Sequence, residues 1–216
     1  MAKVRSIISL SGTLSGMTCV DSSTYGAHVR AKRGTYKPIS LAEGMKESAA
    51  IQTQVNLMAK VIFDAVKDFV PGFKNGKLWA RLLSVFRQQK KAEKDYGYAD
   101  FNLMEMRTDY PTSKHGTFQL EKDQEDGLLL RYQLHGAAYY RLRLLRVATD
   151  ESLLQAYPQE ILTVDLKDGT KAGSLRLDFS VLPTNANVLY VLHCERLLTG
   201  VPEGLLKSNG VRFLWV

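Results

Sequence analysis

The side chains best suited to chemistry in this sequence are two cysteines and four histidines. A nucleophilic Cys–His pair requires the fold to bring thiol and imidazole together. Cys19 and His28 are close enough in sequence to face each other across a hairpin, although such neighbours more often only pack. His193 and Cys194 are adjacent, so in a regular strand they point to opposite faces and cannot share a metal ion. We expect neither a catalytic pair nor a metal site.

The glycines and carboxylates carry no catalytic signature either. Gly12 and Gly16 form a G-x-x-x-G spacing that lacks the Lys-Ser/Thr and the helix of a phosphate-binding loop. The carboxylates within 123–126 crowd one turn before Gly127, which is ordinary turn chemistry. A G-x-S-x-G nucleophile elbow is absent from the sequence. These absences favour a protein that is not an enzyme and uses no cofactor.

Basic side chains are concentrated in the first half of the chain. Residues 1–94 hold 16 Lys and Arg against 6 Asp and Glu, whereas residues 95–216 hold 13 against 16. This asymmetry predicts contact with nucleic acid, an acidic protein surface or the acidic half of another copy. A solvated surface, with cations favoured near a helix C-terminus, is the alternative. The candidates for contact with an anionic partner are Arg30, Lys32, Arg33, Arg87, Lys90, Lys91 and Lys94.

Residues 1–34 are expected to form an arm of short strands. Gly12, Gly16, Gly26 and Gly34 divide this segment into pieces too short to bury a core of their own. Such an arm must pair with its own chain or with a neighbouring subunit, where an added strand gains backbone hydrogen bonds. The side chains expected to supply the apolar contacts of this assembly arm are Ile8, Leu10, Leu14, Met17, Cys19 and Val29.

Two helices are expected within residues 35–116. Ser40 and Glu43 have the S-x-x-E spacing of a capping box. The following helix carries one apolar stripe and stops at Pro71-Gly72. The stripe consists of Ile51, Val55, Met58, Ile62, Val66 and Phe69. A second helix is expected from about Asn75 to Lys94, with Leu78, Leu82 and Val85 inward, followed by a connector with a short helical turn at 101–106.

The remaining residues, 117–216, alternate with period two and predict a β-rich domain. About seven strands are expected, at 117–121, 127–134, 137–147, 160–166, 172–181, 187–196 and 210–216. Their number and spacing favour an antiparallel sandwich of immunoglobulin-like or jelly-roll type. Residues 188–194 are apolar on both faces, as expected of a central strand covered on both sides. The predicted fold is therefore α+β, with an arm, a helical hairpin and a β-sandwich.

Several finer features of these strands are also predicted. The alternation slips at Leu144-Leu145, which predicts a bulge, and Ser208-Asn209-Gly210 predicts a hairpin turn. Two strands carry distinctive alternating faces. One is apolar, with Leu175, Leu177, Phe179 and Val181, and the other is a basic and aromatic face, or an ordinary outer face, with Tyr139, Arg141 and Arg143.

The composition bounds the cellular context. Two cysteines do not make a disulfide framework, so free thiols are expected at Cys19 and Cys194, although one disulfide is permitted. The N-terminus lacks the long apolar run of a secretory signal, and no stretch is long and apolar enough to span a membrane. We therefore expect the protein to be synthesised in the cytoplasm without a signal peptide. Its later release as part of a particle is compatible with this expectation.

G-T-L-S-G at 12–16 and V-R-A-K-R-G at 29–34, followed by two helices and a β-rich half, resemble a group of uncharacterised Bacteroidota proteins. That group opens with a similar glycine-punctuated hairpin. The specific match covers only the first 34 residues. Where those proteins continue with an arginine-rich helix, this chain has AAIQTQVNLM. The resemblance implies an accessory or structural role and no catalytic residues.

Three functions are compatible with these observations. The leading hypothesis is a non-enzymatic structural subunit that self-assembles through its arm as a filament, sheath or phage-like particle. One alternative is a nucleic-acid-associated protein that uses the basic half of the chain. The other is a β-sandwich module that binds a protein or carbohydrate through an exposed aromatic patch.

Overall fold

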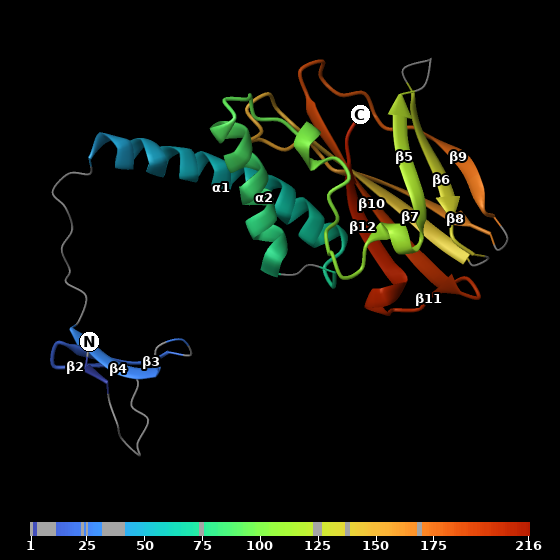
Figure 1. Cartoon of the computed structure of the whole chain (residues 1–216). Helices are drawn as coiled ribbons and strands as arrows, with labels where there is room; N and C mark the ends of the chain where they lie inside the picture. The colour runs from blue at the N-terminus through green and yellow to red at the C-terminus, as the bar shows by residue number, and fades with distance from the viewer. Residues whose placement is uncertain are drawn as a thin grey trace. The chain divides into compact units, whose positions relative to one another are not determined.

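The structure, a computed structural model, describes residues 2–3, 12–22, 24, 26–31, 42–73, 76–122, 127–136, 139–167 and 170–216. Its contacts divide the chain into two compact units, residues 1–46 and 47–216. The described elements are helices and antiparallel sheets, which confirms the predicted α+β class (Figure 1).

The N-terminal unit contains a single four-stranded sheet in the order β1-β4-β3-β2. The strands are β1 (Ala2–Lys3), β2 (Gly12–Leu14), β3 (Met17–Ser22) and β4 (Gly26–Ala31). Ser15 and Gly16 join β2 to β3 with φ values of 45° and 77°, as a two-residue hairpin turn requires. The predicted short strands are therefore present, and they pair with one another.

The larger unit carries the two predicted helices, α1 (Glu43–Phe69, which begins in the N-terminal unit) and α2 (Gly76–Lys91). The apolar stripe on α1 is confirmed, because its side chains are buried from Val55 to Phe69 and Ile51 packs against them. The helix ends just before Pro71, as predicted. Ser40, the expected capping residue, lies outside the described residues.

The second helix ends at Lys91, earlier than the predicted end at Lys94. Glu93 has a φ of 55°. Its N–H donates to the Lys90 carbonyl at 3.1 Å, and the Lys94 N–H donates to the Gln89 carbonyl at 3.0 Å. This pair of hydrogen bonds is a Schellman C-cap, in which glycine usually holds the left-handed position. The sequence does not indicate this end of α2, because glutamate and not glycine occupies the left-handed position.

The connector between α2 and the sandwich contains two single turns of 3₁₀ helix, η1 (Ala99–Phe101) and η2 (Thr112–Lys114). The helical turn expected at 101–106 is therefore wrong in position. Phe101 is fully buried and packs on the Phe86 ring of α2 with 5.0 Å between ring centroids. Burial of the Phe101 side chain places a helical turn that ends at Phe101, whereas the sequence predicts a turn that begins there.

All seven predicted strands of the C-terminal half are present. They are β5 (Gly116–Lys122), β6 (Leu128–Leu134), β7 (Tyr139–Thr149), β8 (Glu160–Leu166), β9 (Ala172–Leu177), β10 (Asn187–Leu198) and β12 (Asn209–Leu214), with the short β11 (Val201–Pro202) and η3 (Leu206–Ser208) between the last two. One sheet has the order β5-β6-β9. The other has the order β8-β7-β10, with β11 and β12 both paired to β10. This is the Greek-key order of an immunoglobulin-like sandwich whose fourth strand, β8, pairs with β7 instead of β9.

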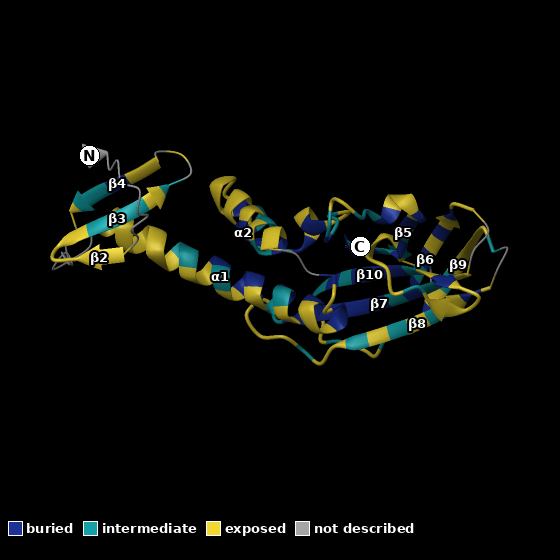
Figure 2. Ribbon diagram, turned by 90° about the horizontal axis from the view of Figure 1, so that it is seen from below, coloured by how far each residue is buried: buried dark blue, intermediate teal, exposed yellow. Residues whose placement is uncertain are grey.

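The five-stranded sheet is the middle of three layers. Leu145, Val191 and Phe213 pack into one core with the helices, whereas Leu144 and Leu192 pack into a second core with the three-stranded sheet. Figure 2 shows that β7 and β10 are buried along much of their length. The predicted double cover of residues 188–194 is confirmed.

The bulge predicted at Leu144-Leu145 is wrong. The ladders from β7 to β8 and to β10 run in unbroken register through both leucines. Both side chains are buried because β7 is covered on its two faces. The loss of alternation therefore reflects a second covering layer and not an inserted residue.

The hairpin turn predicted at 208–210 is also wrong. Asn209 and Gly210 lie in β12, which pairs with β10. The chain reverses earlier, at Thr199 and Gly200, whose φ values are 50° and 84°. A Cβ atom on Gly210 would lie 2.8 Å from the Thr112 Cα atom. Glycine at this position therefore permits a close approach of the connector, which is its other common role in strands.

The strand predicted over 172–181 is shorter than expected, since β9 ends at Leu177. Leu175 and Phe179 are partly buried against the core between the sheets. Val181, by contrast, is 99% exposed. The predicted apolar face therefore stops at Phe179, whose ring packs 5.7 Å from that of Tyr190.

Candidate functional site

The N-terminal sheet has one apolar face. Side chains paired across antiparallel strands share a face, and the register pairs Leu14 with Met17 and Cys19 with Val29. Met17 and Cys19 are two residues apart on β3, so they point to the same side. The four side chains therefore lie together. The same face also holds Gly12, Asp21, Ala27 and Ala31.

No described part of this unit covers that face. Leu14 is 79% exposed and Met17 is 55% exposed, while Cys19 and Val29 are half-buried. Among the residues within 1–46 whose burial is described, only His28 is buried. A sheet needs a buried apolar face or a covering layer to be stable by itself. The described part of this one has neither.

The opposite face, which we call the polar face, is mostly polar and also carries the half-buried Val20. Thr13 and Thr18 share a hydrogen bond of 3.0 Å between their hydroxyl groups. His28 lies on this side because it pairs with Val20. Cys19 and His28 therefore point to opposite faces of the sheet. The nucleophilic pair considered for these two residues is not formed.

Four of the six assembly candidates thus meet on one surface, which we call the apolar face: Leu14, Met17, Cys19 and Val29. Ile8 and Leu10 lie outside the described residues. Sequence reasoning missed Ala27 and Ala31, which extend the face along β4. Their signal was the alternation in GAHVRA, where the small apolar residues fall two apart.

No protein-family model matches this chain. Neither a curated protein nor a solved structure matches it. No helix in the described part is long and apolar enough to cross a membrane. We therefore infer a function from the chain's own surfaces.

The basic candidates differ in how free their charges are. Arg87 donates to the side-chain oxygen of Gln52 at 2.7 Å, and Lys94 lies 3.8 Å from a carboxylate oxygen of Asp100. Lys90 and Lys91 are exposed and form no ion pair with a described residue. Arg30 is half-buried on the polar face of the N-terminal sheet. Lys32 and Arg33 lie outside the described residues.

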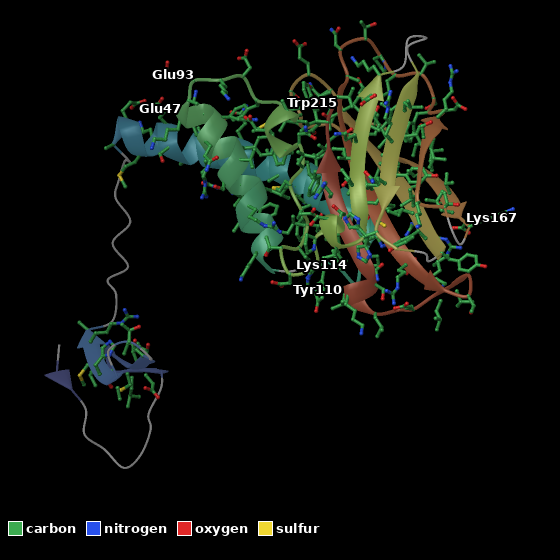
Figure 3. The ribbon with its side chains drawn as sticks, turned by 45° about the vertical axis from the view of Figure 1, so that its right-hand side comes forward. Glu47, Glu93, Tyr110, Lys114, Lys167 and Trp215 are labelled. Carbon is green, nitrogen blue, oxygen red and sulfur yellow. The ribbon has the colours of Figure 1, made fainter. Side chains whose placement is uncertain are left out.

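Acidic side chains accompany the lysines at the end of α2. Figure 3 shows Glu47 and Glu93 at the same end of the helical hairpin. The hydrogen bond from Arg87 to Gln52 joins the two helices there. This end of the hairpin is therefore of mixed charge, which reduces the field that a phosphate backbone would meet.

The basic and aromatic strand face of β7 is covered only in part. Arg141 makes a bidentate ion pair with Asp165, with distances of 2.7 and 2.9 Å. Arg143 lies over the Phe69 ring, 4.7 Å from its centroid. Tyr139 remains 37% exposed. Part of this face therefore lies beside the C-terminal end of α1.

The two cysteines are free thiols, as expected. Cys194 is buried between the sheets, whereas the neighbouring His193 points to the helix side and packs edge-on against Phe69. The two residues therefore face opposite ways, as predicted from their adjacency. Burial raises the pKa of the Cys194 thiol far above its usual range, which makes it a poor nucleophile.

Proposed function

We propose that this chain is a non-enzymatic structural subunit that self-assembles through the apolar face of its N-terminal sheet. The observation that carries the proposal is the surface formed by Leu14, Met17, Cys19 and Val29, which no described residue covers and on which Leu14 and Met17 are exposed. Covering apolar surface gains about 25 cal/mol per Å² removed from water. A second layer on this face would supply the core that the described sheet lacks.

A second copy of the same sheet is a suitable cover. Two sheets pack face to face about 10 Å apart, and a two-fold axis lets one patch pair with itself. With the axis parallel to the strands, β2 of one copy lies over β4 of the other. The large Leu14 side chain then meets the small Ala31, so the two faces interlock.

Packing of faces has more support than the strand exchange expected from the sequence. The strands at the two edges of the sheet, β1 and β2, contain two and three residues. Edges this short offer few backbone hydrogen bonds to an added strand. A two-fold contact alone closes into a dimer. A filament, sheath or particle would need a further contact made by residues 47–216.

A role in binding nucleic acid has less support. Among the described candidates it draws on Lys90 and Lys91, because Arg87 and Lys94 are engaged within the chain and Arg30 is half-buried. Measurable affinity for a nucleic acid usually requires several Lys or Arg side chains in contact with phosphate groups. The mixed charge at the end of the helical hairpin also disfavours binding to a nucleic acid.

The test is the mass of the full chain in solution, measured by light scattering over a range of concentrations. Leu14→Glu places a charge on the apolar face, and Thr13→Glu places the same charge on the polar face one residue away. We expect the natural chain and Thr13→Glu to assemble alike. Leu14→Glu should weaken association by about tenfold or more, which is about 1.4 kcal/mol. Circular dichroism checks that both variants fold.

Two results would overturn the proposal. One is a natural chain that stays monomeric at every concentration. The other is a Leu14→Glu variant that associates as tightly as Thr13→Glu.

A further inference from the structure

Beyond the C-terminal end of α1, the helix-facing side of the central sheet is open and forms a pocket of about 370 Å³. The helix ends at Phe69 and the chain turns away at Pro71. The sheet residues past that point therefore face a pocket instead of a helix. Its polar floor is made by Arg143, His193 and Glu195, and its apolar walls include Phe69, Phe73 and Leu206.

The register explains why the polar residues meet. His193 and Glu195 are two apart on β10 and share a face, and Arg143 of β7 pairs directly with His193. The same face carries Leu145 and Val191 where the helices cover it. The side chains change from apolar to charged at the point where that cover ends.

Arg143 has unused hydrogen-bond donors. Its guanidinium lies over the Phe69 ring at 4.7 Å, and it makes no hydrogen bond or ion pair with a described residue. The neighbouring Arg141 differs, because Asp165 binds it with two hydrogen bonds. A guanidinium carries five N–H donors in a planar fork, which suits a carboxylate. Arg143 is therefore a free anion-binding group on the pocket floor.

Glu195 is the second charged group. Its carboxylate accepts no hydrogen bond from a described residue, and burial raises its pKa, opposed by Arg141 and Arg143. A half-buried carboxylate without donors is poorly solvated, so a ligand that supplies N–H donors would be favoured there.

His193 separates the two charges without adding one. Its Nε2–H donates to the Asn209 side-chain oxygen at 2.7 Å, and the Asn209 amide donates to the Leu205 carbonyl at 2.7 Å. Burial lowers the pKa of His193 to about 4, so the ring is neutral at neutral pH. The floor therefore presents one cation and one anion.

We propose that this pocket binds a free α-amino acid with an apolar side chain. Arg143 binds the carboxylate, Glu195 binds the ammonium group, and the side chain lies against Phe69, Phe73 and Leu206. A simple anion would be repelled by the carboxylate of Glu195, and a simple cation would be repelled by the guanidinium of Arg143. A zwitterion satisfies both groups, and the volume lies at the small end of ligand pockets. This inference is independent of the proposed assembly.

The test is isothermal titration calorimetry of the full chain with L-phenylalanine, L-leucine and L-methionine as probes. Two blocked probes isolate the charges: L-phenylalaninamide lacks the carboxylate, and N-acetyl-L-phenylalanine lacks the ammonium group. We expect each blocked probe to bind about tenfold or more weakly than L-phenylalanine, since one charged contact is lost.

Three variants assign the contacts. Arg143→Gln and Glu195→Gln should each lower the affinity for L-phenylalanine by about tenfold or more. Arg131→Gln on β6 is the control, because it removes a cation that does not line the pocket and pairs with Glu121 at the surface. Its affinity should stay within about threefold of the natural chain. Circular dichroism checks folding, and the blocked probes test the natural chain even where a variant does not fold.

The inference fails if none of the three amino acids gives heat at millimolar concentration. It also fails if the blocked probes bind as tightly as L-phenylalanine, or if Arg143→Gln binds it as tightly as Arg131→Gln.

Discussion

Cys19 and Val29 lie directly opposite each other on neighbouring strands of the N-terminal sheet, on the face that its described residues leave uncovered. Cys194 is buried between the two sheets of the sandwich. The chain therefore holds one thiol on the surface proposed for assembly and one inside a core. Each can report on its own surroundings.

Thiol labelling should separate these two cysteines. In dilute native protein we expect Cys19 to react with a disulfide reagent and Cys194 to stay unreactive, because burial excludes the reagent and disfavours the thiolate. The absorbance of the released product then corresponds to one thiol per chain, and to two in denaturant. Cys19→Ala and Cys194→Ala assign the signals. Labelling of Cys19 should slow as protein concentration rises, and a rate that does not change would contradict burial of this face on assembly.

The helical stripe of α1 can be tested at two adjacent residues. Met58 is fully buried, whereas Leu57 is 49% exposed. Met58→Ala should lower the free energy of unfolding by about 2–5 kcal/mol through lost burial and a cavity. Leu57→Ala should change it by about 0.5 kcal/mol or less. Urea unfolding followed by circular dichroism measures both. Equal losses would mean that the stripe does not pack as described.

The stripe and the strands could be predicted because periodicity in the sequence reflects which side chains are buried. Val55, Met58 and Ile62 recur at helical spacing because one side of α1 faces the sheet. Leu144 and Leu145 broke the pattern because their strand is covered on both faces. No local signal distinguishes a second covering layer from a bulge, since either one places two apolar residues in succession.

The candidate surfaces were predictable to different degrees. The apolar residues of the arm were visible singly, but only the register shows that Leu14 and Val29 share a face. The sequence marks Arg143 as part of a basic strand face, but it does not indicate a pocket there. Arg143 and His193 lie fifty residues apart in sequence, and they become neighbours only when β7 pairs with β10. Non-local pairing is the information that a single sequence does not display.

The close approach of Gly210 to the connector allows a test of backbone packing. Gly210→Ala would place a Cβ atom 2.8 Å from the Thr112 Cα atom, so we expect a loss of about 1–3 kcal/mol in unfolding free energy from overpacking. Gly44→Ala is the control, because nothing lies within 4 Å of a Cβ atom there. It should not destabilise the chain, since alanine favours a helix more than glycine does. A neutral Gly210→Ala would show that the connector can move away from β12.

Acid sensitivity should arise in part from His193. Burial lowers the pKa of this ring from 6.5 to about 4 in the folded chain, assisted by the charges of Arg143 and His115. The unfolded chain takes up the proton near pH 6.5, so falling pH favours unfolding. This contribution to stability is present above pH 6.5 and is lost as pH falls towards about 4. Burial lowers the pKa of His115 as well, which acts in the same direction.

His193→Gln isolates this effect, because glutamine does not titrate and can still donate a hydrogen bond to Asn209. We expect the unfolding free energy of the natural chain to fall by about 3 kcal/mol more than that of the variant between neutral pH and pH about 4. Urea unfolding at several pH values within this window measures the difference. His135→Gln, at an exposed position, should follow the natural chain. If His193→Gln also follows it, the ring is not buried as a neutral group, and the pocket floor carries an additional charge in acid.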